Sequence, residues 1–312
     1  MHLLVPLLCA LLAACGGSPT PAADPSSAPP VAGFPLVLES ANGRSARLER
    51  PARRVLAGNA GALDLLLAIA DEERVGGINA GTRPYSVAMR DAAVLADAPL
   101  LKTFDMESIA TLDPDLVLTH GWQTMDKGPF LERMSIPVLE LGESDSLDAI
   151  ALDLERLGRA LDVRERAAAV VEDLRARAAV LAEVDRSQLE AMTLSGGDGG
   201  SWSAGSGTTA AFVIELAGLT HLTSARGLEG HFQLDHEQLL ELDPEVLVVP
   251  SDDGTLAGSS TWRAIESDAR LAGLRVRSDA GQVVPIDALL LGTTSHHLID
   301  AAEALAAAID AP

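Results

Sequence analysis

The longest regular pattern of apolar and polar positions runs from Arg164 to Val184. Apolar Val171, Leu174, Ala178 and Leu181 recur at steps of three and four, and charged residues fill most other positions. This period is typical of an amphipathic helix, and the stretch contains neither Gly nor Pro. With a rise of about 1.5 Å per residue, such a helix spans roughly 30 Å, the width of a small domain. The pattern predicts one long helix that joins two lobes stiffly.

A second pattern occurs once on each side of this helix. Residues 105–118 read DMESIATLDPDLVL and residues 235–248 read DHEQLLELDPEVLV, at an offset of 130 residues. In each unit an Asp is placed to cap a short helix, a Glu follows two residues later, and Asp-Pro precedes an aliphatic strand. An offset this long suits a duplicated half better than a solenoid repeat. We therefore expect two similar α/β lobes.

Shorter runs complete an alternation of strands and helices. A hairpin is expected at 34–49, strands at 54–59, 75–78, 115–119, 137–141, 189–194, 246–249 and 283–286, and helices at 63–69, 146–161, 208–217 and 295–309. The Gly-rich residues 195–207 and residues 227–232 are expected to form loops. Strands that alternate with helices predict parallel sheets. The expected fold is α/β, with two Rossmann-like lobes of parallel sheets bridged by one long rigid helix.

This organisation divides the chain into five segments. We expect a signal at 1–15, a tether at 16–35, an amino-terminal lobe at 36–163, the bridging helix at 164–184 and a carboxy-terminal lobe at 185–312. A chain of 312 residues is long enough for two such domains.

The first residues have the pattern of a secretory signal. Their apolar run is too short to span a bilayer and ends in Leu12-Ala13-Ala14-Cys15, which is similar to a bacterial lipobox whose cysteine receives the lipid. An ordinary signal peptide with a chance cysteine is the alternative. Residues 16–35 are rich in Pro, Gly, Ser and Ala, as a tether requires. We expect an exported protein anchored by lipid on Cys15, in the periplasm of a cell with an outer membrane or on the outer face of the membrane otherwise.

The composition excludes several partners. The chain has 23 Lys plus Arg against 45 Asp plus Glu, a net charge of −22, which repels nucleic acid and anionic lipid surfaces. No nucleic-acid partner is expected, and membrane contact is expected only through the lipid anchor. Its two cysteines, Cys9 and Cys15, lie in the signal segment, so the mature fold has no disulfide and no cysteine metal site.

Candidate ligand-binding side chains lie where predicted strands end. The carboxyl ends of parallel strands meet at one edge of a sheet, where ligands of open α/β folds bind. Aromatic residues are only 3% of the chain, yet Tyr85, Trp122, Trp202 and Phe232 all fall in these connections. A loop tryptophan wedged against its own lobe is an equal alternative for each of them. The candidate residues are Asn59, Tyr85, His120, Trp122, Trp202, His231 and Phe232.

From residue 34 to 309, the chain resembles the helical-backbone (class III) substrate-binding proteins of bacterial ABC importers, which deliver ferric siderophores, haem or cobalamin. The resemblance is carried by the strand at Arg54-Val55 with its Leu-rich helix, by Pro137-Val138, and by the segments Glu107–Leu118, Leu157–Val163 and Glu237–Val248. It implies two lobes around a ligand cleft, no enzymatic activity and no resident cofactor. It also implies a monomer whose partners are an ABC permease and its ATPase.

The resemblance also assigns roles to particular residues. Glu107 and Glu237 match the glutamates that dock onto permease arginines, although each also suits a helix N-terminus without docking. Tyr85 lies in the loop where haem-binding members carry an iron-ligating tyrosinate. Tyr85 and His231 can therefore close on a ferric centre within the cargo, or Tyr85 can simply lie on the rim.

Other readings remain open at the level of sequence. Cobalamin is the alternative cargo to a ferric siderophore or haem, and catecholate siderophores are disfavoured because the cleft loops offer mainly Arg83, Lys102 and Arg226 as cations. A non-transport envelope lipoprotein and a metal-dependent enzyme are alternatives of another class. The Gly205–Thr209 turn lacks the lysine of a phosphate-binding loop, and no nucleophile elbow follows a strand, which argues against an enzyme.

Overall fold

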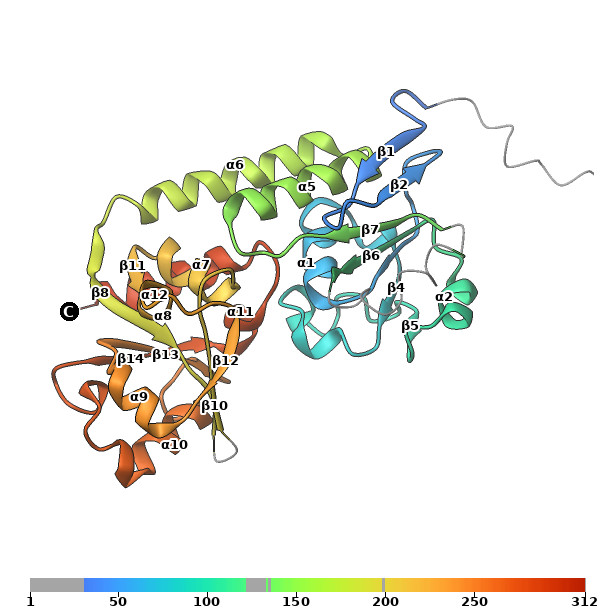
Figure 1. Cartoon of the computed structure of the whole chain (residues 1–312). Coiled ribbons are helices and arrows are strands. Elements are labelled where there is room, and N and C mark those ends of the chain that lie inside the picture. The colour runs from blue at the N-terminus through green and yellow to red at the C-terminus, as the bar shows by residue number, and fades with distance from the viewer. Residues whose placement is uncertain (1–30, 122–132, 134–135, 198–199, 312) are drawn as a thin grey trace, which may run out of the picture.

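The computed structural model describes residues 31–121, 133, 136–197 and 200–311 (Figure 1). It contains two α/β lobes, each built on a parallel sheet, and helix α6 (Arg164–Leu181) runs along one edge of the molecule from one lobe to the other. The expected fold class is therefore confirmed. The proposed signal, the tether up to residue 30 and Trp122 lie outside the described residues.

The amino-terminal lobe is a five-stranded parallel sheet preceded by a hairpin. The sheet order is β5-β4-β3-β6-β7, and the hairpin pairs β1 with β2 as the sequence predicts. Its strands are β1 (Leu36–Glu39), β2 (Ser45–Leu48), β3 (Val55–Ala57), β4 (Val75–Asn79), β5 (Leu100–Leu101), β6 (Leu116–His120) and β7 (Val138–Leu141). Its helical elements are α1 (Ala60–Ile69), η2 (Glu72–Arg74), η3 (Arg83–Tyr85), η4 (Ala88–Arg90), α2 (Met106–Leu112) and α5 (Leu147–Leu161).

The carboxy-terminal lobe holds two sheets. A four-stranded parallel sheet has the order β11-β8-β13-β14, and a small antiparallel sheet has the order β12-β10-β9. Its strands are β8 (Arg186–Thr193), β9 (Ser195–Gly197), β10 (Gly200–Ala204), β11 (Leu219–His221), β12 (His231–Leu234), β13 (Val246–Ser251) and β14 (Gln282–Asp287). Its helical elements are α7 (Thr209–Leu216), α8 (Leu222–Ala225), α9 (His236–Leu242), α10 (Ser260–Ser267), η5 (Ala269–Leu271), η6 (Arg275–Arg277), α11 (Ala288–Gly292) and α12 (Leu298–Asp310).

The small sheet corrects two expectations from the sequence. Residues 195–207 and 227–232 were expected to be loops, but most of the first segment forms β9 and β10, and the second ends in β12. Their Gly and Ser content is typical of turns, whereas pairing supplies the backbone hydrogen bonds that the sequence alone does not reveal. The register pairs Trp202 with Gln233 and Ala204 with His231. Trp202, His231 and Phe232 are therefore strand residues.

The two repeated units fold alike. Asp105 caps α2 by accepting the N–H of Ser108, and Asp235 caps α9 in the same way in a capping box with Gln238. Both helices end at an Asp in the left-handed region, with φ of 46° at Asp113 and 39° at Asp243.

The acidic residue that follows the proline of each repeated unit makes an equivalent contact in the two lobes. Asp115 accepts the N–H groups of Arg53 and Arg54 before β3, and Glu245 accepts the N–H of Glu190 in β8. Each unit thus fixes its buried strand to the neighbouring strand of the same lobe.

Helix α6 connects the lobes through a narrow apolar stripe. Ala167, Val171, Leu174 and Leu181 are buried, and the helix packs on α1 and α5 of the first lobe and on α12 of the second. It ends at Leu181, three residues before the expected end, because residues 182–184 turn into β8. Arg177 in the helix pairs with Asp300 and with Glu303, at 2.6 Å, in α12.

Beneath these helices the lobes share one hydrophobic core. A single cluster of buried side chains includes residues of α1 and α5 and also residues of α7, α12 and β14. Smaller clusters fill the other face of each parallel sheet. The lobes also meet directly, where the Ser144 hydroxyl donates to the Thr294 carbonyl at 2.9 Å and Arg90 pairs with Asp287 at 2.9 Å.

Gly61 marks the closest approach of the lobes. A Cβ at this position would lie 2.1 Å from the Thr294 hydroxyl oxygen and 2.5 Å from its carbonyl oxygen, so only glycine fits without displacing the backbone. Helix α1 can therefore begin directly against the loop before α12.

We predict that Gly61→Ala lowers the free energy of unfolding by about 1–3 kcal/mol, because the added methyl group forces the two lobes apart. Urea unfolding of the purified chain measures this change. The matched control is Gly81→Ala, where the nearest atom to the added Cβ is 3.7 Å away. Equal stability of the two variants would show that the Gly61–Thr294 contact does not hold the lobes together.

Candidate functional site

A pocket of about 320 Å³ lies in the second lobe at the junction with the first. Figure 1 shows β10 and β12 on the side of this lobe that faces the first lobe, and Thr294, which contacts Gly61, lies in the pocket wall. The lining residues are Thr193, Leu194, Ser195, Trp202, Ser203, Ala204, Thr209, Ala210, His231, Pro250, Ala288, Leu291, Gly292 and Thr294.

Antiparallel pairing brings two of the candidate residues to this pocket. Trp202 in β10 and His231 in β12 both line it, and the Trp202 side chain is 46% exposed. Phe232, one residue further, packs against the second hydrophobic cluster of its lobe and does not line the pocket. The alternation of side chains along a strand accounts for this difference.

The described pocket wall carries no formal charge. Its residues are small, hydroxylated or apolar, with one imidazole and one indole, and none is Asp, Glu, Lys or Arg. Helix α7 begins in this wall at Thr209. The Thr208 hydroxyl caps the N–H of Ala211, whereas the N–H groups of Thr209 and Ala210 in the pocket wall have no acceptor within the helix. Among the residues described, the pocket is suited to a ligand that presents apolar surface and neutral oxygens.

Tyr85 lies in the first lobe on an exposed turn. Its side chain is 68% exposed at the end of η3, and it does not line the pocket. The following residues are anchored, since the Asp64 carboxylate accepts the N–H groups of Val87 at 3.1 Å and Ala88 at 3.2 Å and also the Ser86 hydroxyl. Burial raises the pKa of Asp64, and these hydrogen bonds oppose the rise. Tyr85 therefore projects from a fixed loop.

Asn59 and His120 form a buried pair beneath the first lobe's sheet edge. The Asn59 amide donates to His120 Nδ1 at 2.9 Å, and its carbonyl oxygen caps α1 by accepting the N–H of Ala62. The ring of His120 is therefore protonated at Nε2, for which the described residues supply no hydrogen-bond partner. Burial lowers the pKa of His120 to about 4. Neither side chain lines the described pocket.

No cluster of three or more His, Cys, Asp or Glu side chains in the described residues is arranged to hold a metal ion. The structure also does not bring Tyr85 and His231 into one pocket. Coordination of a ferric centre by these two residues therefore stays a prediction.

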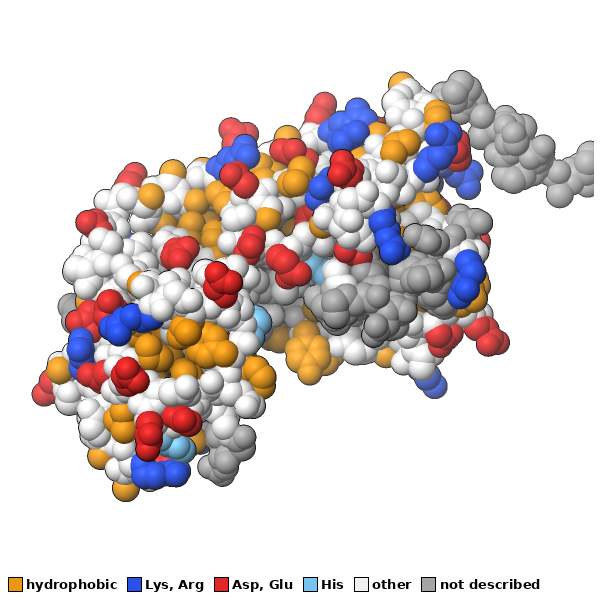
Figure 2. Space-filling model, in the orientation of Figure 1, with side chains coloured by type: hydrophobic (Ala, Val, Ile, Leu, Met, Phe, Trp, Pro, Cys, Tyr) orange, Lys and Arg blue, Asp and Glu red, His pale blue; other side chains and the backbone are white. Residues whose placement is uncertain are grey.

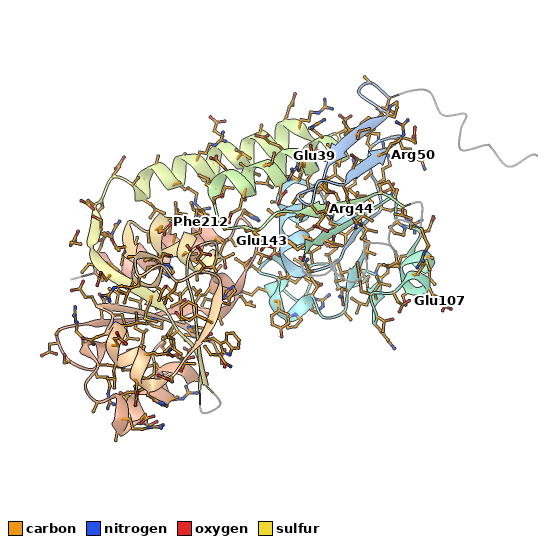
Figure 3. All side chains as sticks on the ribbon, viewed as in Figure 1. Glu39, Arg44, Arg50, Glu107, Glu143 and Phe212 are labelled. Carbon is orange, nitrogen blue, oxygen red and sulfur yellow. The ribbon has the colours of Figure 1, made fainter. Side chains whose placement is uncertain are left out.

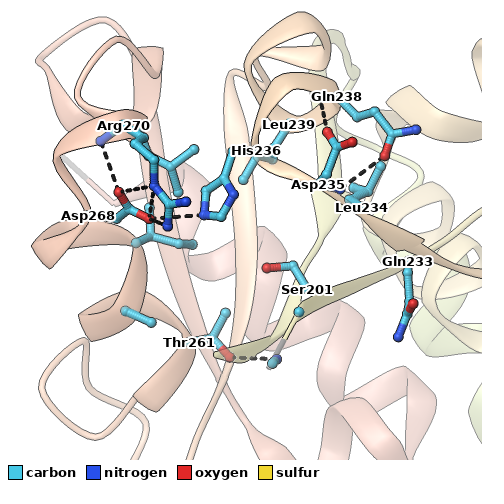
Figure 4. A pocket seen from close by; sticks show the side chains of 15 residues that line it. Ser201, Gln233, Leu234, Asp235, His236, Gln238, Leu239, Thr261, Asp268 and Arg270 are labelled. Atoms are coloured by element: carbon cyan, nitrogen blue, oxygen red, sulfur yellow. Dashed lines mark hydrogen bonds and ion pairs between the residues drawn. The ribbon is translucent and has the colours of Figure 1, made fainter. Parts of the chain in front are cut away.

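A second pocket, of about 500 Å³, lies on the other side of the small sheet (Figure 4). It is lined by Ser201 and Gln233 of that sheet, by the capping box of α9, and by a polar cluster in which Asp268 pairs with His236 at 2.9 Å and Arg270 at 2.6 Å. The pattern of residues along the chain does not predict this pocket. The Asp-Gly sequence at residues 198–199, a dipeptide typical of hairpins, is the signal that would have indicated pairing of the segments before and after it.

The two glutamates expected to dock the permease are exposed on equivalent helices. Glu107 lies in the first turn of α2, at the edge of the first lobe, and Figure 3 shows it far from Glu143 near the lobe junction. Glu237 lies in the first turn of α9, beside the second pocket. Neither glutamate lines the pocket at the lobe junction.

One helix that joins two parallel-sheet lobes, with a pocket where they meet, defines a class III binding-protein fold. The chain belongs to the periplasmic binding protein family, whose sequence model matches residues 55–274 and so includes both lobes and α6. A curated cobalamin-binding protein of Halobacterium salinarum is 25% identical over 235 residues, 74% of this chain. The match spans 63% of that relative, less than two thirds of its length.

Solved structures share the fold. A crystal structure described as an ABC-type Fe3+-hydroxamate transport system from Saccharomonospora viridis has a TM-score of 0.69 and 24% identity, covering 89% of this chain and all of that one. A periplasmic haem-binding protein from Pseudomonas aeruginosa has a TM-score of 0.65 and 23% identity, covering 82% of this chain and 92% of that one. At these identities the likeness shows the fold. Within the described part of the chain, no helix has the length and apolar character needed to cross a membrane.

The buried His120 predicts a pH-dependent stability. Its folded-state pKa of about 4 lies below the usual histidine value of 6.5, so the unfolded chain binds the proton first and stability falls as pH drops from 6.5 towards 4. When the pH is lowered from 7 to 5, the free energy of unfolding of the wild-type chain should fall. In His120→Gln this fall should be smaller by about 2 kcal/mol. Denaturant unfolding at both pH values measures the difference.

The wild-type chain should lose more than this amount, since burial also lowers the pKa of His221 to about 4 and of His296 to about 3. The control is the interval from pH 8 to pH 9, in which His120 is almost fully neutral in both states and the two chains should respond alike. An unchanged slope between pH 7 and pH 5 in His120→Gln would mean that His120 is not buried in its neutral form.

Proposed function

We propose that this chain is the substrate-binding lipoprotein of an ABC importer and that it holds an iron complex in the cleft between its lobes. The family membership and the pocket that contains Trp202 and His231 at the lobe junction carry the proposal. In this role the protein is exported, is anchored by lipid on Cys15, passes its cargo to a permease and its ATPase, and performs no catalysis.

The uncharged pocket wall favours one kind of iron complex. A ferric catecholate carries several negative charges that a binding site must offset with cations. Three hydroxamates neutralise Fe3+, so a ferric trihydroxamate has no net charge and presents apolar methylene groups with carbonyl oxygens. Trp202 would pack on this surface, while N–H groups at the start of α7 would donate hydrogen bonds to its oxygens. A solved structure of the same fold is described as a Fe3+-hydroxamate transport system.

Haem binding requires a coordinating side chain, which a siderophore does not. The haem iron needs an axial ligand from the protein, for which the exposed Tyr85 or His231 is the candidate.

Cobalamin is the second candidate cargo because the curated relative from Halobacterium salinarum is described as a cobalamin-binding protein. Asn59, His120, Trp122 and Phe232 remain proposed cleft residues; the buried Asn59–His120 pair would act by holding the strand end that supports the cleft.

We predict that the purified chain binds one of three coloured ligands, a ferric trihydroxamate, haem or cobalamin, and quenches tryptophan fluorescence on titration. Trp202→Ala should weaken binding by roughly 1.5–3 kcal/mol, about 10- to 150-fold in Kd, because the indole loses its burial against the ligand. The matched control is Leu256→Ala, an exposed apolar side chain outside the pocket.

In the same titration, the variant Tyr85→Phe distinguishes haem bound through the Tyr85 phenolate from the other two ligands. Removal of the hydroxyl should shift the Soret band only if the phenolate coordinates haem, and should leave trihydroxamate and cobalamin affinity within about twofold. Failure of all three ligands to bind contradicts the proposed function. Tight binding of a ferric catecholate contradicts the charge argument alone.

We predict that Glu107→Arg combined with Glu237→Arg abolishes cargo uptake by cells while the Kd of the purified protein stays within error. Both side chains are exposed and lie outside the junction pocket, so charge reversal removes attraction to permease arginines without altering the cleft. The matched control reverses exposed charges elsewhere on each lobe, at Glu73 and Asp279. Normal uptake in the first double variant, or equal loss in the control, would exclude a docking role.

A further inference from the structure

The net charge of −22 is distributed unevenly over the fold. Residues 31–54 and 147–181, which form the hairpin, the segment before β3 and helices α5 and α6, hold 11 of the 23 basic and 9 of the 45 acidic residues, a net charge of +2. The remaining 12 basic and 36 acidic residues give −24. The molecule therefore has a weakly positive edge and strongly negative lobes.

The positive charge is concentrated at the amino-terminal end of this edge. We call the five arginines Arg44, Arg47, Arg50, Arg53 and Arg54 the basic edge; they lie within 11 consecutive residues, all exposed, with Glu49 as the one acidic residue among them. Arg47 pairs with Glu49 and Arg54 pairs with Asp113, and all four of these side chains are more than half exposed. Exposed pairs of this kind leave the patch positive at longer range.

Contacts place the basic edge beside helices α5 and α6, which carry further arginines. The N–H of Ala52 donates to the carbonyl of Ala160 at the end of α5, and Gly33 lies next to the guanidinium of Arg164 at the start of α6. Figure 2 shows Lys and Arg side chains gathered at this corner of the molecule, and Figure 3 places Arg50 there.

The described chain also begins at this corner. Val31 lies directly before β1, and 15 residues separate it from Cys15. A segment of that length reaches at most about 50 Å when fully extended, at ~3.3–3.6 Å per residue. If Cys15 carries lipid, the basic edge is the part of the fold that the anchor holds nearest to the bilayer.

The proposed docking glutamates lie apart from most of the basic edge. Glu237 is in α9, at the opposite edge of the second lobe from α6, and Figure 3 shows Glu107 on the side of the first lobe away from Arg50. Arg54 is the exception, since it pairs with Asp113 at the other end of the helix that carries Glu107. An anionic surface would attract the basic edge and repel these acidic lobes.

We propose that the basic edge binds the anionic phospholipid headgroups of the membrane that holds the anchor and so orients the free protein. In this orientation α5, α6 and the hairpin face the membrane, and Glu107 and Glu237 point away from it. The protein then has to rotate on its tether before it docks on the permease. The proposal uses the proposed lipid anchor only for proximity, and the attraction itself needs no lipid on Cys15.

A vesicle experiment tests the attraction without the anchor. The purified chain carrying Cys15→Ser, which cannot be lipidated, is mixed with vesicles of phosphatidylcholine alone or with one third phosphatidylglycerol, at low and at high salt. We expect flotation only with the anionic vesicles and a loss of binding at high salt, because the Debye length shortens. Arg47→Gln, Arg50→Gln and Arg53→Gln together should reduce the partition coefficient by about tenfold or more, since each arginine near an anionic surface contributes a factor of about five.

The matched control makes the same change in net charge on the lobes. Lys102→Gln, Arg226→Gln and Arg263→Gln, all at exposed positions, should leave the partition coefficient within about twofold of the parent. Binding lost equally in both triple variants would show a non-specific effect of net charge and overturn the proposal. Equal binding to both kinds of vesicle, or none to anionic vesicles, would overturn it as well, while the proposed transport function would stand.

The orientation is tested with a single fluorescent label. With Cys9 and Cys15 replaced by Ser the chain has no cysteine, so a thiol can be introduced at exposed Ser45 in β2 or exposed Ser278 in the second lobe. Brominated anionic lipids should quench the label at Ser45→Cys and leave that at Ser278→Cys unquenched. Equal quenching at both positions would contradict the proposed orientation.

Discussion

The shared apolar core beneath α5 and α6 is the constraint on which the rest of the structure depends. Side chains of α1 and α5 from the first lobe and of α7 and α12 from the second belong to one buried cluster, so the lobes cannot separate without exposing apolar surface to water. The Arg177 ion pairs and the Gly61–Thr294 contact add to this attachment. The proposed cleft between lobes joined in this way would be largely preformed and would hold its ligand without a large hinge motion.

The lobes repeat one plan but contribute differently to the site. The repeated unit gives each lobe a capped helix, a left-handed Asp and an acidic side chain that fixes the next strand. The second lobe adds the small sheet, which carries Trp202 and His231 on the side of the junction pocket and the paired residues Ser201 and Leu234 on the side of the second pocket. One ribbon of three short strands therefore separates the pocket at the lobe junction from the surface around Glu237.

Charge is segregated in the same way. The described junction pocket has no charged lining residue, the lobes carry nearly all the negative charge, and the hairpin with its two helices is weakly positive. A neutral pocket has no unpaired charges that would lose their hydration when a ligand binds. Charges on the outer surface keep their hydration, and they act on a partner over about one Debye length. These surfaces suit a protein that meets a neutral cargo, a cationic partner and an anionic membrane.

The sequence by itself determined the helices and strands that depend on interactions between residues close together in the chain. The period of residues 164–181 gave α6, and the repeated caps, Asp-Pro stops and aliphatic runs gave α2, α9, β6 and β13 in a two-lobed fold. Tertiary structure alone decided the site, because the pairing of β10 with β12 depends on backbone hydrogen bonds between residues about 30 positions apart. Burial likewise makes His120 the neutral partner of Asn59, since a sequence pattern does not reveal which side of a strand end is covered.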